Sequence, residues 1–294
     1  MEEHPLYAPE APETPSTISA PDPAVPPPFG SAKSLRGVFV MFFLMMLGMI
    51  VVGGMIYFFF GFAINAFATE IGVILLPVLA IIPRVHRFSL LKLNRRPDLM
   101  PVFVAMVGML GLAMMLSEWS YWSDQVFPMP EIIKQAYLQA ITAHSISELL
   151  ILIFVVGMIP GLCEEVAFRG YFQQVFQSRF GRTQGIFVAA ALFALMHMDP
   201  WHMPALFAIG VFLGYLFVWT GSLWVPIIAH FVNNAASVIM VYAAPENELS
   251  QIAEAPPTWL LLGGTLVFIL SIHWFRQRYN PEPERPDISH STIE

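Results

Sequence analysis

Long apolar runs, separated by short polar segments, fill the middle of this 294-residue chain. A helix that crosses the hydrocarbon core of a bilayer, about 30 Å thick, needs about 20 apolar residues. Runs of that length lie at residues 37–62 and 223–242. Further apolar runs predict helices at residues 69–83, 100–116, 147–168, 186–198, 204–219 and 258–274. The pattern predicts an all-α, polytopic membrane protein with about eight transmembrane helices.

The runs at residues 69–83 and 186–198 are short for a complete crossing. By length alone, either run fits a re-entrant or buried helix as well as a transmembrane one. The number of crossings therefore rests on a second signal, the placement of charge.

The basic residues favour eight crossings. The chain has 14 Lys and Arg residues. If the amino terminus is cytoplasmic and the helices alternate in direction, all of them except Lys134 fall on the cytoplasmic side. Cytoplasmic loops of membrane proteins carry such an excess of Lys and Arg. We therefore expect both termini in the cytoplasm.

The composition agrees with a membrane protein and excludes some functions. Apolar residues make up 56% of the chain and charged residues only 12%, whereas a soluble domain has about 25% charged residues. The net charge is −7 and no basic stripe is present, so nucleic acid is not an expected partner. Cys163 is the single cysteine, which excludes an intramolecular disulfide and a cysteine-based zinc motif.

The chain divides into three parts by composition. Residues 1–35 are rich in Pro and polar residues and predict a disordered cytoplasmic tail. Residues 276–294 predict a second polar cytoplasmic tail. The membrane domain is expected between them, at residues 36–275.

A few polar side chains lie inside the predicted spans. Ionisable groups are costly there and usually face the interior of a helix bundle or a wet cavity. Glu70 and Glu148 lie at span ends and are expected to reach water. The polar residues that remain are Glu164, Glu165, Arg169, His197, His230 and Asn234.

The sequence GLCEEVAFRG predicts a buried ion pair. Glu165 and Arg169 are four residues apart and therefore share one helix face. Glu164 is rotated by about 100° from that face and has no cation at this spacing. A carboxyl group in apolar surroundings suits general acid or base catalysis. The alternative is a helix end at the interface, where Glu165 and Arg169 extend to water.

Two histidines follow on later spans. His197 ends the sequence FALMH, and His230 lies four residues before Asn234 on one helix face. Either histidine alone is more often a structural residue than a catalytic one. A helical hairpin that turns near residues 181–185 would place Glu164 and His197 within about one turn of each other in height. The spacing permits one shared site and leaves the helix rotations open.

These residues resemble the motifs of the CPBP family of intramembrane proteases, also called the CAAX protease and bacteriocin-processing or Abi family, which includes the type II CAAX prenyl endopeptidase. The family pattern EExxxR, FxxxH and HxxxN occurs in order within a motif core at residues 161–234. The matching residues are Glu164, Glu165, Arg169, Phe193, His197, His230 and Asn234.

The resemblance implies a role for each residue. Glu164 would be the general base that activates a water molecule with His197. His230 and Asn234 would stabilise the oxyanion. Glu165 and Arg169 would hold the site together as a buried pair, and Phe193 would pack over it. The family also implies a location in the cell membrane of a bacterium. The expected partners are the lipid bilayer and a peptide or protein substrate, either a CaaX-type lipidated segment or a bacteriocin- or signal-like peptide.

A metal-dependent mechanism stays open. Glu164, His197 and His230 match the ligand types of a zinc site with a fourth position for water, although the HExxH motif of soluble zinc proteases is absent. Zinc or another divalent metal is therefore an alternative to a glutamate-centred water mechanism.

Two functions other than proteolysis are also open. The chain could be a non-catalytic bacteriocin-immunity or scaffold protein of the same fold. It could also be a proton-coupled transporter, because intramembrane Glu and His residues build proton relays. The internal repeat that marks many transporters is absent from the sequence.

Overall fold

The computed structural model describes residues 35–244 and 257–279, and every regular element in these ranges is a helix. The predicted tail at residues 1–35 lies outside the described residues except for Leu35. The last helix continues through Tyr279, so residues 276–279 of the predicted polar tail are helical. The rest of that tail lies outside the described residues.

The chain begins with a helical hairpin. Its first arm contains α1 (Leu35–Gly48), η1 (Met49–Gly53) and α2 (Gly54–Phe60), and its second arm contains α3 (Phe62–Thr69), η2 (Glu70–Leu75) and α4 (Leu76–Ile81). Gly61 joins the arms with φ 78°, a conformation that a residue with a Cβ atom rarely adopts. The short helices η3 (Arg84–His86) and α5 (Arg87–Leu90) follow.

The second half of the fold carries the sequence motifs. Its elements are α6 (Leu99–Val126), α7 (Glu131–Ile141), α8 (Ile146–Leu152), η4 (Ile153–Met158), α9 (Ile159–Ala167), η5 (Phe168–Gln173), α10 (Gln174–Phe180), α11 (Arg182–Met196), α12 (Met203–Thr220), α13 (Trp224–Ala243) and α14 (Thr258–Tyr279). The elements from α8 to α10 form one continuous helix of 35 residues.

The all-α, polytopic prediction is confirmed. Seven helices of the described residues are long and apolar enough to cross a membrane, and α11 is a shorter apolar helix. All eight predicted apolar runs are helical. The run predicted at residues 69–83 belongs to a helix that begins at Phe62 and is 20 residues long. This helix is therefore long enough for a complete crossing. The run predicted at residues 186–198 is α11, with 15 residues.

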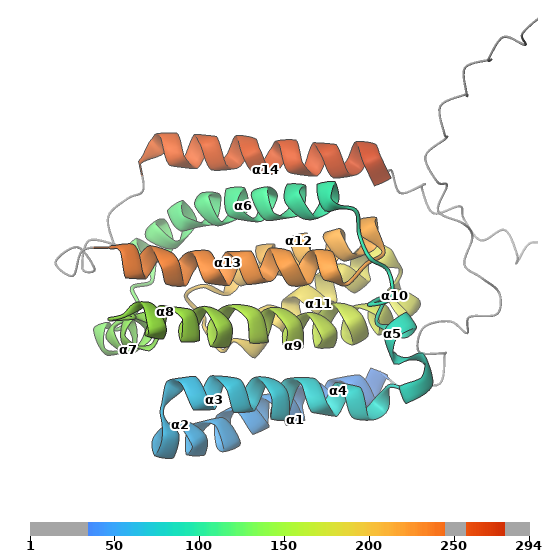
Figure 1. Ribbon diagram of the computed structural model, residues 1–294, viewed down its shortest axis with the longest axis horizontal. Helices are drawn as coiled ribbons and strands as arrows, with labels where there is room; N and C mark the ends of the chain where they lie inside the picture. The colour runs from blue at the N-terminus through green and yellow to red at the C-terminus, as the bar shows by residue number, and fades with distance from the viewer. Residues whose placement is uncertain (1–34, 245–256, 280–294) are drawn as a thin grey trace, which may run out of the picture.

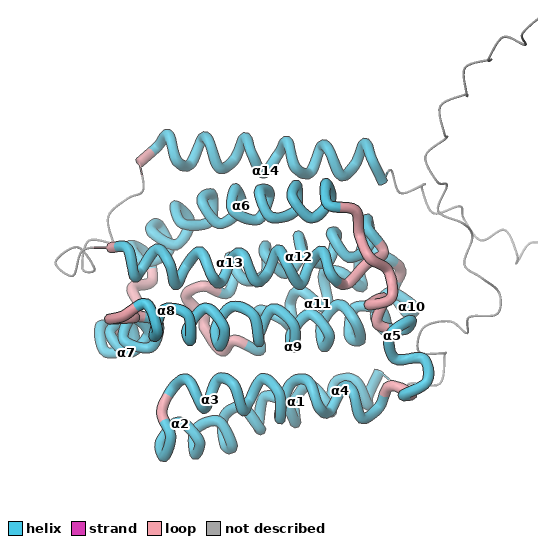
Figure 2. Tube along the Cα trace, viewed as in Figure 1, coloured by secondary structure: helices cyan, strands magenta, loops and turns pink. Residues whose placement is uncertain are grey.

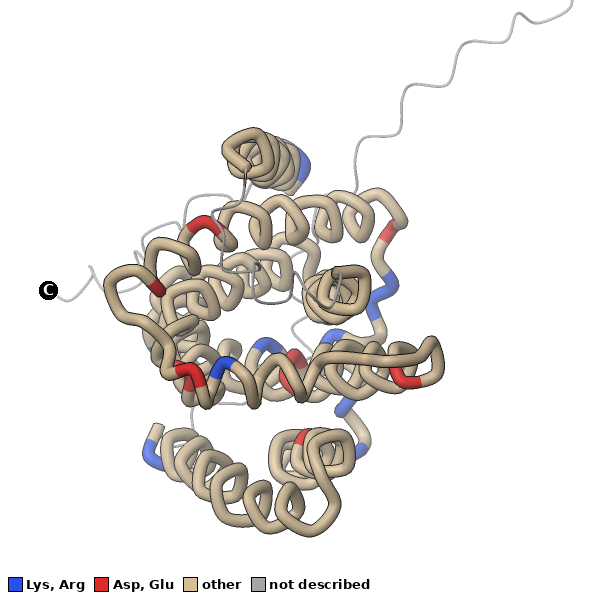
Figure 3. The backbone as a smooth tube through the Cα atoms, turned by 90° about the vertical axis from the view of Figure 1, so that its left-hand side faces the viewer, with Lys and Arg blue, Asp and Glu red and all other residues tan. Residues whose placement is uncertain are grey.

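The helices lie nearly side by side in layers (Figure 1). α14 and α6 form one outer layer, α12 and α13 lie next to them, and the hairpin from α1 to α4 covers the opposite side beyond α9 (Figure 2). Acidic and basic residues are sparse along the helices and more frequent at their ends and connections (Figure 3). The basic connection at α5 and the turn after α10 lie at the same end of the bundle.

Apolar side chains fill two large cores and a smaller one around Leu152 and Val238, and they also cover the outside. One core packs the hairpin against α9, α10 and α11 around Phe168, Phe172 and Phe193. A second core joins α6, α12, α13 and α14 around Leu213 and Phe275. Many large apolar side chains of the spans are nevertheless exposed, such as those along α1 and α2. This surface is suited to lipid, because a water-facing protein rarely exposes apolar patches of that extent.

Three wide helical turns occur in the parts of the fold that surround the motifs. The segments η2, η4 and η5 are π-helical, and such turns are rare and frequently lie at functional sites. Pro160 explains η4, because proline lacks an N–H and its ring clashes with the carbonyl group four residues earlier, that of Val156. The wide turn therefore leaves the Val156 carbonyl without its usual helical partner.

The contact between α6 and α14 generates a stability prediction. A Cβ atom on Gly264 would lie 2.6 Å from the Cβ atom of Met114 and 2.9 Å from the carbonyl oxygen of Gly111. A Cβ atom on Gly263 would have nothing within 4 Å. We expect Gly264→Val to lower the free energy of unfolding by about 1–3 kcal/mol and the matched control Gly263→Val to lower it much less. Thermal unfolding of the purified protein in detergent measures both; equal losses would contradict the close packing.

Candidate functional site

The centre of the candidate site is a buried ion pair on the long helix. Arg169 pairs through Nη1 with Oε1 of Glu165, and both side chains are fully buried. Nη2 of Arg169 donates to the carbonyl oxygen of Gly210 on α12, 3.0 Å away. The guanidinium also lies 4.5 Å from the ring centroid of Phe193 on α11. The predicted pair is confirmed, and the alternative in which these residues extend to water at a helix end is wrong.

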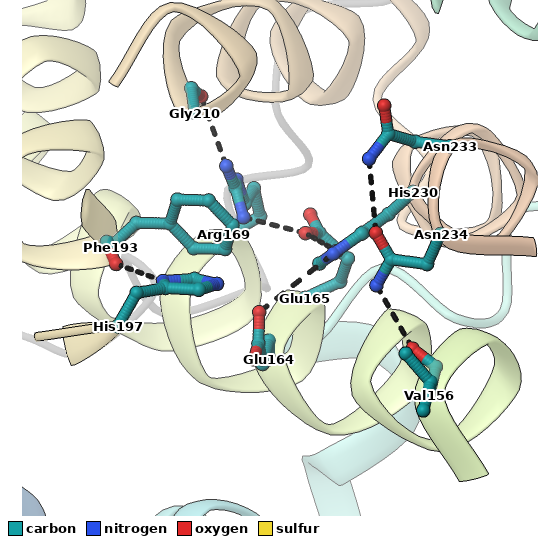
Figure 4. Close-up of polar contacts among 10 residues, drawn as sticks. All are labelled: Val156, Glu164, Glu165, Arg169, Phe193, His197, Gly210, His230, Asn233 and Asn234. Carbon is teal, nitrogen blue, oxygen red and sulfur yellow. Dashed lines mark hydrogen bonds and ion pairs between the residues drawn. The ribbon is translucent and has the colours of Figure 1, made fainter. Parts of the chain in front are cut away.

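His230 on α13 joins the same carboxylate. Its Nδ1 lies 2.9 Å from Oε1 of Glu165. An ionised carboxylate only accepts hydrogen bonds, so Nδ1 donates. The other ring nitrogen, Nε2, lies 3.9 Å from Oε2 of Glu164, which is too far for a direct hydrogen bond. Glu165 therefore orients His230 so that Nε2 faces Glu164 (Figure 4).

Glu164 offers an oxygen atom without a protein donor. The residue is 8% exposed, and among the described residues its Oε2 has no hydrogen-bond partner. Buried polar atoms are nearly always paired with protein or water. Within the described residues, Oε2 of Glu164 is thus available to accept a hydrogen bond from a bound water or substrate.

His197 is fixed at the end of α11. Its Nδ1 lies 2.8 Å from the carbonyl oxygen of Phe193, and because a carbonyl only accepts, Nδ1 donates and Nε2 is left as the acceptor. The ring of Phe193 contacts both imidazoles, with ring centroids 4.8 Å from His197 and 5.7 Å from His230. Phe193 therefore sets the position of one histidine relative to the other.

The loop after His197 follows the end of α11 and has its own hydrogen bonds. Met198 adopts φ 51°, a left-handed conformation that is costly for a residue with a side chain. The next residue, Asp199, accepts hydrogen bonds from the backbone of Trp201 and from both the backbone and Nδ1 of His202. Burial alone would raise the pKa of Asp199, but the hydrogen bonds and charge of His202 lower it.

Asn234 has a structural partner that the motif does not reveal. Its Nδ2 donates to the carbonyl oxygen of Val156, 3.0 Å away, which is the carbonyl released by Pro160. Its Oδ1 accepts from Nδ2 of Asn233. In Figure 4 the amide points along the long helix toward Val156. One of its two N–H bonds is left for a ligand, so the oxyanion role of Asn234 stays a prediction.

Glu70 is the residue that the sequence reasoning missed. It was expected to reach water at a span end, but it is 7% exposed and lies in the middle of the second arm of the hairpin. The segment η2 packs against α9, and Glu70 lies close enough to Glu164 for the two carboxyl groups to interact electrostatically. A polar residue inside an apolar hairpin was the available signal, whereas Glu148 is exposed as expected.

The proposed metal ligands do not form a ligand set in this arrangement. Within residues 35–244 and 257–279, no three His, Cys, Asp or Glu side chains lie together so that they could hold one metal ion. This includes Glu164, His197 and His230. Metal analysis of the purified protein tests whether a metal ion takes part.

Comparison with known proteins finds a family match for one part of the chain. Residues 146–236 match the Rce1-like family of type II CAAX prenyl endopeptidases. This segment of the chain is therefore similar to proteins of the CAAX protease type. The matched segment contains all the motif residues from Glu164 to Asn234, which confirms the resemblance. It does not contain Glu70.

Two curated relatives agree with this assignment. The chain is similar to the membrane-embedded CAAX protease MroQ of Staphylococcus aureus (strain USA300), with 37% identity over 102 residues, 33% of this chain and 41% of that protein. It is also similar to the putative membrane peptidase YdiL of Bacillus subtilis (strain 168), with 29% identity over 117 residues, 39% of this chain and 46% of that protein. The chain thus spans less than half the length of these relatives. No solved structure matches it.

The buried ion pair predicts a large loss of stability when it is broken. We expect Arg169→Met to lower the free energy of unfolding by about 3–5 kcal/mol, because it leaves the charge of Glu165 buried without its cation. Arg179→Met on the exposed end of α10 is the control and should change it little. Denaturant unfolding in detergent measures both, and a wild-type result for Arg169→Met would show that Glu165 does not depend on the pair.

The Glu70–Glu164 contact predicts the opposite effect. Each of these carboxyl groups has one buried oxygen without a donor among the described residues, which costs stability. We expect Glu70→Met to raise the free energy of unfolding by about 1–3 kcal/mol, while Glu148→Met, at an exposed helix start, should not raise it. A loss of stability in Glu70→Met would mean that Glu70 is well satisfied and holds the hairpin in place.

Proposed function

We propose that this chain is an intramembrane endopeptidase that hydrolyses a peptide bond with a water molecule activated by Glu164 and His197. The convergence of Glu164 and His230, from separate transmembrane helices, on one buried position is the observation that carries this proposal. The similarity of residues 146–236 to the Rce1-like family supports it, as do two similar proteins, which are named as a CAAX protease and a putative membrane peptidase.

The first step assigns the proton of the attacking water. Oε2 of Glu164 accepts it as the oxygen of the water bonds to the carbonyl carbon of the peptide. Nε2 of His197, left as an acceptor by the Phe193 carbonyl, holds the second hydrogen of the water and aims a lone pair at the peptide. A base near the reacting atom contributes typically 10²–10⁴-fold to the rate.

The second step concerns the charge on the tetrahedral intermediate. Nε2 of His230 donates to the oxyanion when the imidazole carries both protons, and Glu165 stabilises that cation through Nδ1. The second N–H of Asn234 is the other available donor. Donors fixed in place before the reaction stabilise such charge more than mobile water does. The intermediate then collapses, the C–N bond breaks, and Glu164 returns its proton to the leaving amine.

The substrate would be a peptide segment that reaches this depth in the membrane. A CaaX-type lipidated tail and a bacteriocin- or signal-like peptide both meet that condition, and the name of one relative favours the CaaX type. We place the protein in the cell membrane of a bacterium with both termini cytoplasmic. The basic connections at one end of the bundle support this orientation.

The proposed base gives a direct test. We expect Glu164→Gln to lower kcat/KM for a quenched peptide by at least about 100-fold, because Gln cannot accept the water proton. Glu148→Gln, at the exposed start of α8, is the matched control and should keep the wild-type rate. Thermal unfolding of both variants shows that they are folded. Unchanged turnover in Glu164→Gln would refute the mechanism.

The same purified protein distinguishes proteolysis from the two other functions. Absence of turnover by the wild-type protein across a broad peptide panel would favour a non-catalytic immunity or scaffold protein. Substrate-dependent proton flux in proteoliposomes would instead favour a transporter.

A further inference from the structure

A cavity of about 840 Å³ lies between α6, α11, α12 and α14, outside the candidate site. Aromatic side chains line much of it, including Phe187, Phe207, Tyr215 and Trp219. The carbonyl of Gly210, which accepts from Arg169, belongs to α12 but is not part of this lining. Since the lining residues of α12 recur at helical spacing, they form one face of the helix, and the site lies against another.

One end of this cavity is positively charged. Arg182, the first residue of α11, and Arg276, in the last turn of α14, both line it, and none of the described residues that line it is acidic. Lys92 stands close to Arg182: burial, followed by the charges of Arg95 and Arg182, lowers the pKa of Lys92 to about 8. An anionic group at this end would therefore meet the guanidinium groups of Arg182 and Arg276.

The dimensions fit one leaflet of a bilayer. The lining residues of α12 extend from Phe207 to Trp219, which is about 18 Å along a helix. Half of a hydrocarbon core of about 30 Å is about 15 Å. Trp219 and Tyr215 lie toward the charged end, where aromatic rings commonly meet lipid headgroups. The cavity is thus apolar over the length of an acyl chain and cationic where a headgroup would be.

We propose that this cavity binds one anionic phospholipid of the leaflet on the side of Arg182 and Arg276. Its acyl chains would lie between the aromatic side chains of α11 and α12, and its phosphate would contact the two guanidinium groups, which suit phosphate because of their planar pairs of donors. The lipid would brace α14 against α12 on the side away from Glu164. The proposal does not depend on peptide hydrolysis.

Native mass spectrometry of the full chain tests it. The protein is purified in detergent and titrated with phosphatidylglycerol and, separately, with phosphatidylcholine of the same acyl chains. We expect tighter binding of one phosphatidylglycerol molecule, and a loss of about tenfold in its affinity in the double variant Arg182→Gln/Arg276→Gln. Arg278→Gln, exposed on the same last turn of α14 but outside the lining, is the matched control and should bind as the wild type does.

Several outcomes would overturn the proposal. Equal affinity for the two lipids, or wild-type affinity in the double variant, would show that the arginines do not select a headgroup. Binding of inorganic phosphate that displaces the lipid would point to a free anion as the ligand. Displacement of the lipid by a prenylated peptide would assign the cavity to the substrate. Thermal unfolding of the double variant, which changes only residues at the surface, confirms that it is folded.

Discussion

The rest of the site depends on the Glu165 carboxylate, which accepts hydrogen bonds from two side chains. Glu165 receives the guanidinium of Arg169 from its own helix and Nδ1 of His230 from α13. Arg169 in turn reaches the backbone of α12 and the ring of Phe193 on α11. A charge in this apolar setting persists only when its partners are in place. The pair therefore fixes four helices relative to one another before any substrate is present.

Much of this arrangement could be predicted from the sequence, because it depends on periodicity. Apolar runs indicate membrane helices, and a spacing of four residues predicted the pair of Glu165 and Arg169. Family motifs then identified both histidines. Helix rotation cannot be read from a run that is apolar on all sides, so Glu70 could not be assigned to the interior. The partner of Asn234 could not be predicted either, because the effect of Pro160 on the long helix depends on what packs beside it.

The amino-terminal hairpin contributes a side chain next to the candidate site. The family match begins at residue 146, yet η2 of the hairpin places Glu70 against Glu164. A buried carboxyl group without a cation lowers the stability of the fold. Such a loss of stability is usually retained only near functional groups. The wall of the site that carries Glu70 thus comes from outside the segment by which the family is recognised.

The carbonyl group released by Pro160 has a consequence for how these sequences change over time. The proline on one helix creates an acceptor, and the amide of Asn234 on another helix uses it. With another residue at position 160, the backbone N–H of that residue would donate to the Val156 carbonyl. The Asn234 amide would then lose this acceptor. Selection should therefore treat Pro160 and Asn234 as a linked pair, so that relatives which lose one tend to replace the other as well.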